Sequence, residues 1–171
     1  MPPAFTRLTT PLGELLLTAS DTALTGVYFP TSHHIPPLHQ MERGALKDSL
    51  TVAGDEVLAR ACQQLTDYFA GTRTTFDLPL DAAGSAFEQR VWDALRTIPY
   101  GATTSYGELA RRLGDIKATR AVGAANGKNP IPIIVPCHRV VGAKGELTGF
   151  GGGLDRKRWL LEHEGVLMKL A

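Results

Sequence analysis

The 171-residue sequence has no long apolar run, although 43% of its residues are hydrophobic. A membrane helix needs about 20 consecutive, mostly apolar residues, and no segment approaches that length. The first residues, Met1-Pro2-Pro3-Ala4, also lack the charged and then apolar pattern of an export signal. These absences predict a cytoplasmic protein that does not bind membranes. The length suits one domain of ordinary size or two small ones.

Cysteine is scarce, with only Cys62 and Cys137 in the chain. A reducing compartment disfavours a disulfide, so both are predicted to be free thiols. Cys62 falls on the apolar face of a predicted helix and is interpreted as a core residue without a functional role. The histidines 33, 34 and 39 suggest a metal, but no cysteine or carboxylate cluster accompanies them at ligand spacing. They are interpreted as part of a surface loop, and no metal site is predicted.

An excess of either charge is also missing, since the formal net charge is +1. The two halves nevertheless differ. Residues 1–100 contain 7 Lys and Arg against 11 Asp and Glu, a net charge of −4, whereas residues 101–171 contain 11 against 6, a net charge of +5. The basic half is compatible both with phosphate contacts and with an ordinary solvated surface.

The N-terminal half predicts a small sheet with one helix. Short Thr- and Leu-rich segments on either side of residues 11–13 indicate a hairpin, and a third strand precedes Pro30. Residues 55–69 repeat apolar side chains at helical spacing and end before Gly71. A strand is expected at residues 74–80, and a short helix within residues 41–50. The predicted domain covers residues 1–80, and residues 81–84 are the expected linker.

The C-terminal domain, residues 85–171, is predicted to be mainly helical, which makes the whole chain α/β in the α+β sense. Ser85 is a suitable N-cap for a helix that reaches residue 98. Ser105 and Glu108 fit a capping box that opens a helix to residue 113. A Gly-containing turn and a helix over residues 118–127 complete a helix-turn-helix pattern. The last helix, residues 156–163, is expected to be capped by Asp155.

The second helix of this pair is unusually slim, because small residues dominate it and Arg120 is the one long side chain near its start. Glycine within a helix costs about 1 kcal/mol relative to alanine, so Gly123 needs a reason. Close helix packing is one reason. A face that lies close to a nucleic-acid groove is another. The helix lacks the long polar side chains that read base edges in the major groove, which favours recognition of shape or of the minor groove.

Residues 131–141 place Cys137, His138 and Arg139 next to one another within an apolar stretch. The pattern predicts a buried strand that ends at Pro136, since proline cannot donate to a sheet ladder. Successive side chains of a strand point to opposite faces, so Cys137 and His138 can meet only if the chain turns between them. A free thiol has a pKa of about 8.5 and needs a neighbour that accepts its proton to become reactive at neutral pH.

Cysteine, histidine and a carboxylate together form an activated-thiol site, in which the histidine accepts the thiol proton and the carboxylate orients the histidine. Glu164 is a candidate carboxylate, because an acid at the end of a helix opposes the helix dipole and is not favoured for stability. These parts do not fix the electrophile. A cysteine hydrolase and a DNA-binding regulator that uses the helix-turn-helix alone therefore remain alternatives. The glycine-rich residues 148–153 lack the Gly-Lys-Ser/Thr ending of a phosphate loop, which disfavours nucleoside triphosphates.

Three ordered motifs resemble the O6-alkylguanine-DNA alkyltransferases: residues 120–130, Pro136-Cys137-His138-Arg139-Val140, and residues 159–165 with the sequence WLLEHEG. The resemblance covers most of the C-terminal half and, more loosely, the N-terminal half. It implies a ribonuclease H-like N-terminal domain and a winged-helix-like C-terminal domain. It also implies a single-turnover repair reaction in which the alkyl group of O6-alkylguanine passes to a cysteine without any cofactor, with O4-alkylthymine as a further candidate substrate. The implied partner is double-stranded DNA, bound by a monomer with or without cooperativity.

The resemblance also implies roles for individual residues. Cys137 would accept the alkyl group, His138 would be linked to the thiol through a water, and Glu164 would hold His138. Asn129 would tie the recognition helix to the cysteine segment. Two further groups are implied, one for DNA binding and base flipping (Arg120, Tyr106, Ala121, Gly123, Ser105) and one for the substrate pocket (Val140, Phe150, Gly151, Gly152).

Two departures from the family pattern concern the pocket and a metal. Phe150 and Gly151 stand where many relatives have a tyrosine and a serine. A hydroxyl near the pocket is therefore missing, and the loop is expected to be roomier. The N-terminal half also lacks the cysteines that some relatives use to bind zinc, which again predicts no structural zinc.

Overall fold

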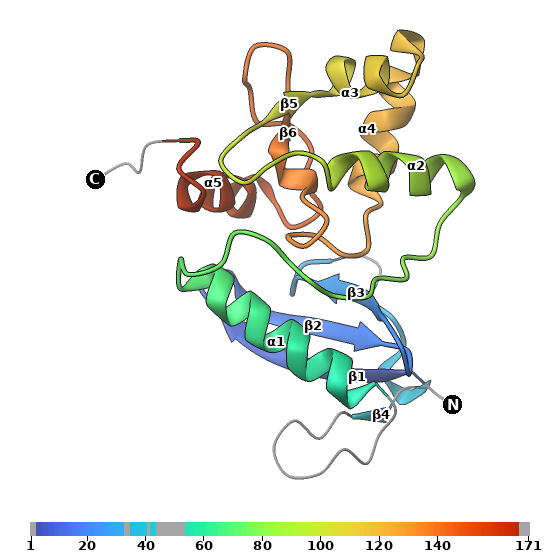
Figure 1. Cartoon of the computed structure of the whole chain (residues 1–171), viewed down its shortest axis with the longest axis vertical. Coiled ribbons are helices and arrows are strands. Elements are labelled where there is room, and N and C mark those ends of the chain that lie inside the picture. The colour runs from blue at the N-terminus through green and yellow to red at the C-terminus, as the bar shows by residue number, and fades with distance from the viewer. Residues whose placement is uncertain (1–2, 33–34, 41, 44–53, 168–171) are drawn as a thin grey trace. The chain divides into compact units, whose positions relative to one another are not determined.

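A computed structural model describes residues 3–32, 35–40, 42–43 and 54–167 of the chain. The chain divides into two compact units, residues 1–83 and residues 84–171. Their colours separate them in Figure 1, blue to green for the first and green to red for the second. Each unit has buried apolar residues that form a core of its own.

The first unit is built on a four-stranded sheet with the order β3-β2-β1-β4. Strands β1 (Ala4–Thr10) and β2 (Gly13–Ala19) form the expected antiparallel hairpin, paired from Ala4 with Ala19 to Thr10 with Gly13. Strand β3 (Leu24–Tyr28) pairs antiparallel with β2, and the short β4 (Glu42–Arg43) pairs parallel with β1. The prediction of a hairpin followed by a third strand is thus confirmed.

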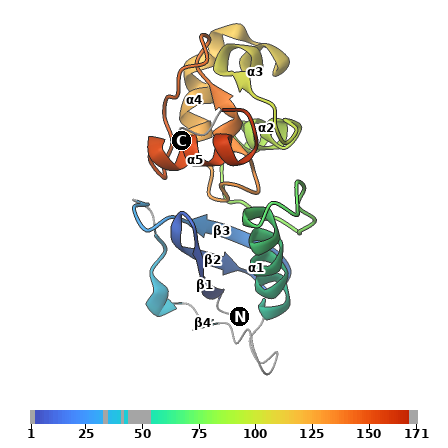
Figure 2. The ribbon, with the colours of Figure 1, turned by 90° about the vertical axis from the view of Figure 1, so that its left-hand side faces the viewer.

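Helix α1 (Asp55–Phe69) packs on this sheet, as Figures 1 and 2 show from two directions. Its buried face contains apolar residues that the periodicity predicted, among them Leu58, Leu65 and Tyr68, which are 0% exposed. The expectation that Cys62 lies in the core needs correction, because Cys62 is only partly buried. Successive helical residues are rotated by about 100°, and Ala61 rather than Cys62 points to the centre of the interface.

The strand expected at residues 74–80 is absent from the described chain, apart from a single bridge between Leu24 and Leu80. The segment is instead held by side chains of α1. The Gln64 amide donates to the Asp77 carbonyl and accepts from the Asp77 amide, both at 2.9 Å. Because Gln64 satisfies both backbone groups of Asp77, that residue has no need of a neighbouring strand.

The polar connection before α1 is described only in part. Most of the short helix predicted within residues 41–50 lies outside the described residues, and the two residues there that are described form β4 instead. His33 and His34 also lie outside them. His39 belongs to the 3-10 turn η1 (Leu38–Gln40), where its ring lies 3.4 Å from the Gln40 amide.

The second unit begins with one helix and continues with the two short helices of the predicted helix-turn-helix. Helix α2 (Ala86–Leu95) begins with the capping box of Ser85 and Glu88 and ends three residues before the predicted limit. Helices α3 (Tyr106–Arg112) and α4 (Thr119–Gly127) are joined through the 3-10 turn η2 (Ile116–Ala118), and both α2 and α3 pack against α4. This is the expected helix-turn-helix.

One detail of α3 differs from the prediction. Ser105 does cap the helix, since its hydroxyl accepts from the Glu108 amide at 3.1 Å. The Glu108 carboxylate was expected to reach back toward Ser105, but it pairs with Arg111 at 2.7 Å and Arg112 at 3.6 Å. Neighbours three and four residues along a helix are in reach of each other, and the two arginines take the carboxylate.

The prediction of a strand over residues 131–136 is wrong, whereas the prediction that these residues are buried is confirmed. Residues 131–135 form buried turns, followed by the 3-10 turn η3 (Cys137–Arg139) and the short strand β6 (Val140–Val141). Pro132 and Pro136 lack the N–H groups that a ladder requires. Ile133 has a φ of 74°, which is uncommon for a β-branched residue and incompatible with a strand.

Strand β6 pairs parallel with β5 (Thr104–Ser105), which leads directly into α3. Helix α5 (Leu154–His163) follows the glycine-rich loop, and Asp155 lies in its first turn instead of capping it. The N-cap residue of α5 is instead Gly153, whose φ is 94°. No helix in the described part of the chain is both long and apolar enough to cross a membrane.

Candidate active site

Cys137 lies in the core of the second unit, with 5% of its surface exposed. It is the first residue of η3, and its backbone amide donates to Val135 at 2.8 Å. Burial raises the pKa of the thiol to about 11, while a hydrogen bond from the Asn129 side chain and the charge of Lys157 act in the opposite direction. The resting group is therefore a neutral thiol with neighbours that favour its ionised form.

In a strand, the side chains of Cys137 and His138 would point to opposite faces. The 3-10 turn instead places both residues in the same buried region. The His138 imidazole is 0% exposed, and its Nε2 lies 2.7 Å from Glu164 Oε2. Burial lowers the pKa of His138, which the Glu164 carboxylate partly offsets. At neutral pH the ring is consequently neutral and able to accept a proton.

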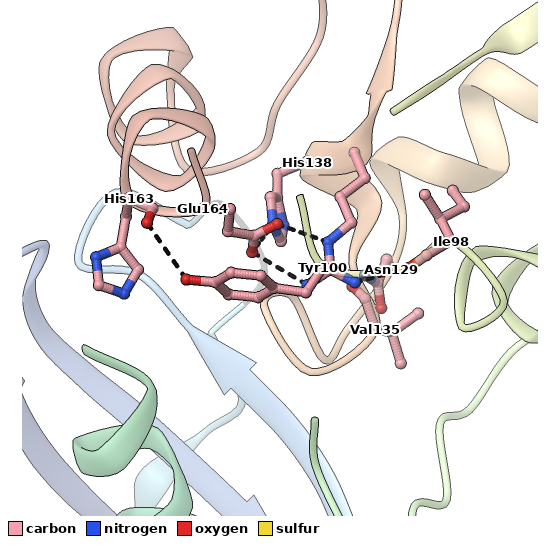
Figure 3. A network of polar contacts seen from close by, with 8 residues as sticks. Ile98, Tyr100, Asn129, Val135, His138, His163 and Glu164 are labelled. Atoms are coloured by element: carbon pink, nitrogen blue, oxygen red, sulfur yellow. Dashed lines mark hydrogen bonds and ion pairs between the residues drawn. The ribbon is translucent and has the colours of Figure 1, made fainter. Parts of the chain in front are cut away.

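Glu164 is the C-cap of α5, and its side chain is 0% exposed. Figure 3 shows its carboxylate between the His138 ring and an arginine side chain. The prediction that this acid serves a purpose other than helix stability agrees with its two partners, because its 2.7 Å contact with His138 fixes the plane of the imidazole. The second nitrogen of the ring, Nδ1, has no hydrogen-bond partner within the described residues.

Arg139 is the partner that the sequence reasoning did not assign. Its guanidinium donates to both oxygens of Glu164, at 2.7 and 3.1 Å, and to the Ile98 carbonyl at 2.7 Å. Its charged end also lies 5.8 Å from the centre of the Tyr100 ring. A buried arginine needs an acidic partner, so an arginine beside an apolar run was a signal for a buried carboxylate.

Two asparagines, one on α4 and one just after it, bond to the cysteine segment. The Asn129 amide donates to the Val135 carbonyl at 2.8 Å and its oxygen accepts from the Ile131 amide at 3.0 Å, in addition to its bond to the thiol. Asn126, which was not predicted, donates to the Cys137 carbonyl at 3.4 Å from a buried position. Asn126 thus joins α4 to the cysteine turn, whereas the side-chain bonds of Asn129 stay within the cysteine segment, and the predicted tie through Asn129 stays a prediction.

Tyr106 and the glycine-rich loop form another side of the same region. The Tyr106 hydroxyl donates to the Thr148 carbonyl at 3.0 Å, and burial, together with the charge of the Cys137 thiolate, raises the pKa of the phenol. Gly152 is buried, while Gly151 is exposed and Phe150 partly exposed. A Cβ atom added at Gly151 would lie 4.0 Å from the Gly127 carbonyl, which places the loop beside the end of α4.

Lys157 is a second residue that the sequence reasoning missed. It is 0% exposed, and its ammonium donates to the carbonyls of Val140 at 2.6 Å and Thr148 at 2.8 Å. Its position on α5 gave a signal, since Lys157, Leu160, Leu161 and Glu164 share the spacing of one helical face. Val140, predicted to line the pocket, is fully buried.

The exposed face of α4 is slim, as predicted. Arg120, Ala121 and Ala124 are exposed, and no ion pair to Arg120 occurs among the described residues. A Cβ atom at Gly123 would meet the Tyr106 ring at 3.8 Å, an ordinary contact distance. Helix packing therefore does not require glycine there.

Among the residues that the structure describes, no group of three or more His, Cys, Asp and Glu side chains could hold a metal ion. The polar side chains around Cys137 bond to one another and to backbone carbonyls instead.

A buried thiol beside a histidine and a carboxylate, in a unit that also holds a helix-turn-helix, is the arrangement expected of a DNA-binding protein that carries a cysteine site. Residues 86–166 match the model of the 6-O-methylguanine DNA methyltransferase, DNA binding domain, and residues 5–82 match the ribonuclease-like domain of the same family. The chain belongs to the 6-O-methylguanine DNA methyltransferase family. The resemblance drawn from the three motifs is thereby confirmed.

Relatives named methylated-DNA--protein-cysteine methyltransferase match nearly the whole chain. The protein of Mycolicibacterium paratuberculosis is 50% identical over 154 residues, covering 90% of this chain and 87% of its own length. That of Shigella flexneri is 42% identical over 168 residues, covering 95% of each. The crystal structure of the Mycobacterium tuberculosis OGT in complex with DNA aligns with a TM-score of 0.83 at 45% identity, covering 94% of this chain and 92% of its own.

Proposed function

We propose that this chain repairs DNA by direct reversal, moving the methyl or other alkyl group of O6-alkylguanine to Cys137 in a single irreversible turnover. The main support is that the buried Cys137 thiol is followed by the His138–Glu164 pair, in a unit that also contains a helix-turn-helix. Family membership and the names of the relatives support the same reaction. Cys137 and the helix-turn-helix belong to one folded unit, which supports this proposal.

The chemistry is a displacement at carbon. The Cys137 sulfur forms a bond to the alkyl carbon as the bond from that carbon to O6 breaks. The thiol gives its proton to neutral His138 through a water, and the same proton is passed on to the released guanine, so that His138 ends neutral. Glu164 holds the ring and stabilises the imidazolium, as a carboxylate does in other activated nucleophiles. A thioether sulfur is a poor leaving group, so Cys137 is not regenerated.

Arg139 extends this arrangement, because its two bonds to Glu164 fix the carboxylate that holds His138. Asn129 supports the thiolate through its hydrogen bond to the sulfur. No cofactor takes part, since the thiol supplies both the nucleophile and the proton. O4-alkylthymine is a second possible substrate, because it presents the same alkyl–oxygen bond.

A base inside a duplex cannot reach a buried thiol and must be extruded at a cost of a few kcal/mol. We assign this step to the α3–α4 pair, lying in the minor groove. Arg120 would replace the flipped nucleotide, Ala121 and Gly123 would allow close approach, and Ser105 would position the start of α3. Tyr106 would turn the base outward and hydrogen-bond it.

The flipped base would enter a pocket bounded by β6 and the glycine-rich loop. The Val140 carbonyl would accept from the guanine amino group, and the amides near Phe150, Gly151 and Gly152 would donate to O6. Val140 and Thr148 are already joined through Lys157, which supports a common pocket wall. The partner is double-stranded DNA that contains O6-alkylguanine. We propose a monomer working in the cytoplasm, where a reducing environment keeps the thiol free.

The test is the intact mass of the protein after mixing with a duplex that carries one O6-methylguanine, followed by peptide mapping. The expected result is a gain of one methyl group on the peptide containing Cys137, saturating at one per molecule. Cys137→Ser should take up none and still bind the duplex. A duplex that is bound without any mass change would support a regulator. Repeated turnover of small esters without DNA would support a cysteine hydrolase.

A companion variant tests the flipping step. Arg120→Ala should slow repair of duplex DNA far more than reaction with the free alkylated base, because only the duplex requires a base to be replaced. Lys144→Ala, which changes an exposed lysine in the turn after β6, is the matched control. Equal slowing of both reactions by Arg120→Ala would remove the proposed role.

A further inference from the structure

Lys157 is a buried cation without an acidic partner. It is 0% exposed, and no carboxylate of the described residues forms an ion pair with it. Its ammonium instead donates to the carbonyls of Val140 and Thr148 at 2.6 and 2.8 Å. Burying an ammonium is costly unless other groups compensate for its charge. Two carbonyl dipoles satisfy its hydrogen bonds but leave a full positive charge inside the unit.

The position of this charge is specific. Val140 directly follows the turn that contains Cys137, and Thr148 accepts both from Lys157 and from the Tyr106 hydroxyl. The ammonium also lies 5.9 Å from the centre of the Tyr106 ring. These contacts hold Lys157 between the cysteine turn and the glycine-rich loop. A charge held beside the residues that follow Cys137 is well placed to stabilise an anion formed at the sulfur.

We propose that Lys157 is a positioning residue whose fixed ammonium is the counter-charge of the Cys137 thiolate. In the transfer reaction the thiol loses its proton before or while sulfur attacks carbon, so a negative charge develops in a buried site. Opposite charges attract more strongly in such surroundings than in water. This role in the reaction rests on the proposed function, whereas the effect on the thiol does not require DNA.

The electrostatic couplings agree with this arrangement. The charge of Lys157 lowers the pKa of Cys137, and a Cys137 thiolate raises the pKa of Lys157. Burial lowers the pKa of Lys157 to about 8, so the amine is mainly protonated at neutral pH. The other titratable groups near the pair are Tyr106 and His138, and Arg139 and Glu164 act through His138. All four remain in the variants below.

The experiment measures alkylation of Cys137 by iodoacetamide, from about pH 6 to about pH 11 so that the scan reaches the pKa of the thiol, with peptide mapping to separate it from Cys62. Lys157→Gln removes the charge and keeps N–H donors for the two carbonyls. Lys157→Met also removes the charge and keeps an unbranched side chain. It serves as a second neutral variant if Lys157→Gln does not fold. Lys157→Arg keeps the charge, and Lys144→Met is the control at an exposed lysine.

The neutral variants should shift the pH–rate profile of Cys137 upward by about one unit, so that alkylation at pH 7 slows by about tenfold. Lys157→Arg should recover most of the rate, and Lys144→Met should match the wild type. A merely structural lysine would give slower alkylation with an unshifted profile. Slower alkylation with an unshifted profile would overturn the inference. So would equal profiles in all proteins, or a wild-type Cys137 that does not react at all.

The same proteins are then mixed with the O6-methylguanine duplex. If the wild type takes up no methyl group while the profile shift is present, the proposed function is wrong and the charge effect on the thiol stands. If the wild type takes up the group and the neutral variants show no shift, only the role of Lys157 is wrong.

Discussion

The two cysteines of the chain have the same raised pKa and different surroundings. Burial brings the thiols of Cys62 and Cys137 each to a pKa of about 11. For Cys62 on α1, burial is the one cause of the shift. For Cys137, a hydrogen bond from Asn129 and the charge of Lys157 oppose burial. The value of the pKa therefore does not identify a reactive thiol, whereas the groups that would stabilise its anion do.

A similar contrast holds for how each unit fixes an irregular segment. In the first unit, the Gln64 amide holds Asp77 through two hydrogen bonds of 2.9 Å. In the second, the Asn129 amide holds Ile131 and Val135 and also bonds to the thiol. The same chemical group has a structural task in one unit and a structural and electrostatic task in the other.

The largest expected effect separates the two thiols directly. Cys137→Ser should abolish methyl transfer, because a hydroxyl is a far weaker nucleophile than a thiolate. Cys62→Ser should leave the transfer rate unchanged and alter the free energy of unfolding by less than about 1 kcal/mol, as is usual away from special features. Single-turnover transfer and urea unfolding measure the two quantities. A loss of transfer in Cys62→Ser would contradict the comparison.

Glu164→Gln should have the next largest effect. It leaves the buried Arg139 without its acidic partner, which costs about 3–5 kcal/mol of unfolding free energy for such pairs. It also removes the carboxylate that orients His138, and transfer should slow by about 10²-fold or more, in line with the usual contribution of general acid–base groups.

The matched control for this variant is Glu162→Gln, which changes a partly exposed acid of the same helix. Its stability and transfer rate should stay close to those of the wild type. Similar losses in the two variants would mean that negative charge near the end of α5, and not the contact with His138, is what matters.

Asn129→Ala and Gln64→Ala test the two amides against each other. Each should cost about 1–3 kcal/mol of unfolding free energy, because each leaves buried backbone groups unsatisfied. Only Asn129→Ala should also slow transfer, by about tenfold, since it removes one hydrogen bond that favours the thiolate. Unfolding in urea and single-turnover kinetics on both variants decide the question. Equal transfer rates would assign Asn129 a structural task alone.

The smallest expected effect is a loss of folding stability at acidic pH. Burial lowers the pKa of His138 in the folded protein, whereas the unfolded chain protonates this ring near pH 6.5. The unfolded state thus binds the proton first, and stability falls as pH falls below about 6.5, by up to about 1.4 kcal/mol for each pH unit. Urea unfolding at a series of pH values should show this slope. His138→Gln should reduce it, and an unchanged slope would assign it to other groups.

Local sequence determined much of the framework. Ser85 and Ser105 cap α2 and α3 as predicted, because a hydroxyl before a helix satisfies nearby backbone amides wherever the rest of the chain lies. The hairpin, α1 and the helix-turn-helix follow from periodicity and turn residues in the same way. The motifs around Cys137, His138 and Glu164 were also sufficient to predict the family.

The path of the chain through Cys137 was decided by the tertiary structure. The apolar residues 131–135 match a buried strand and a buried turn equally well, and periodicity cannot separate them. The turn is fixed by Asn129, by the two prolines and by packing that holds Ile133 at a positive φ.

The buried charges show the same limit. Arg139 and Lys157 are ordinary basic residues in the sequence, and 26 positions separate His138 from the Glu164 side chain that it meets. Whether a charge is solvated or buried depends on what folds over it, since removal from water makes its few remaining partners decisive. Sequence determined which groups are available for the chemistry, and tertiary packing decided which of them share one buried site.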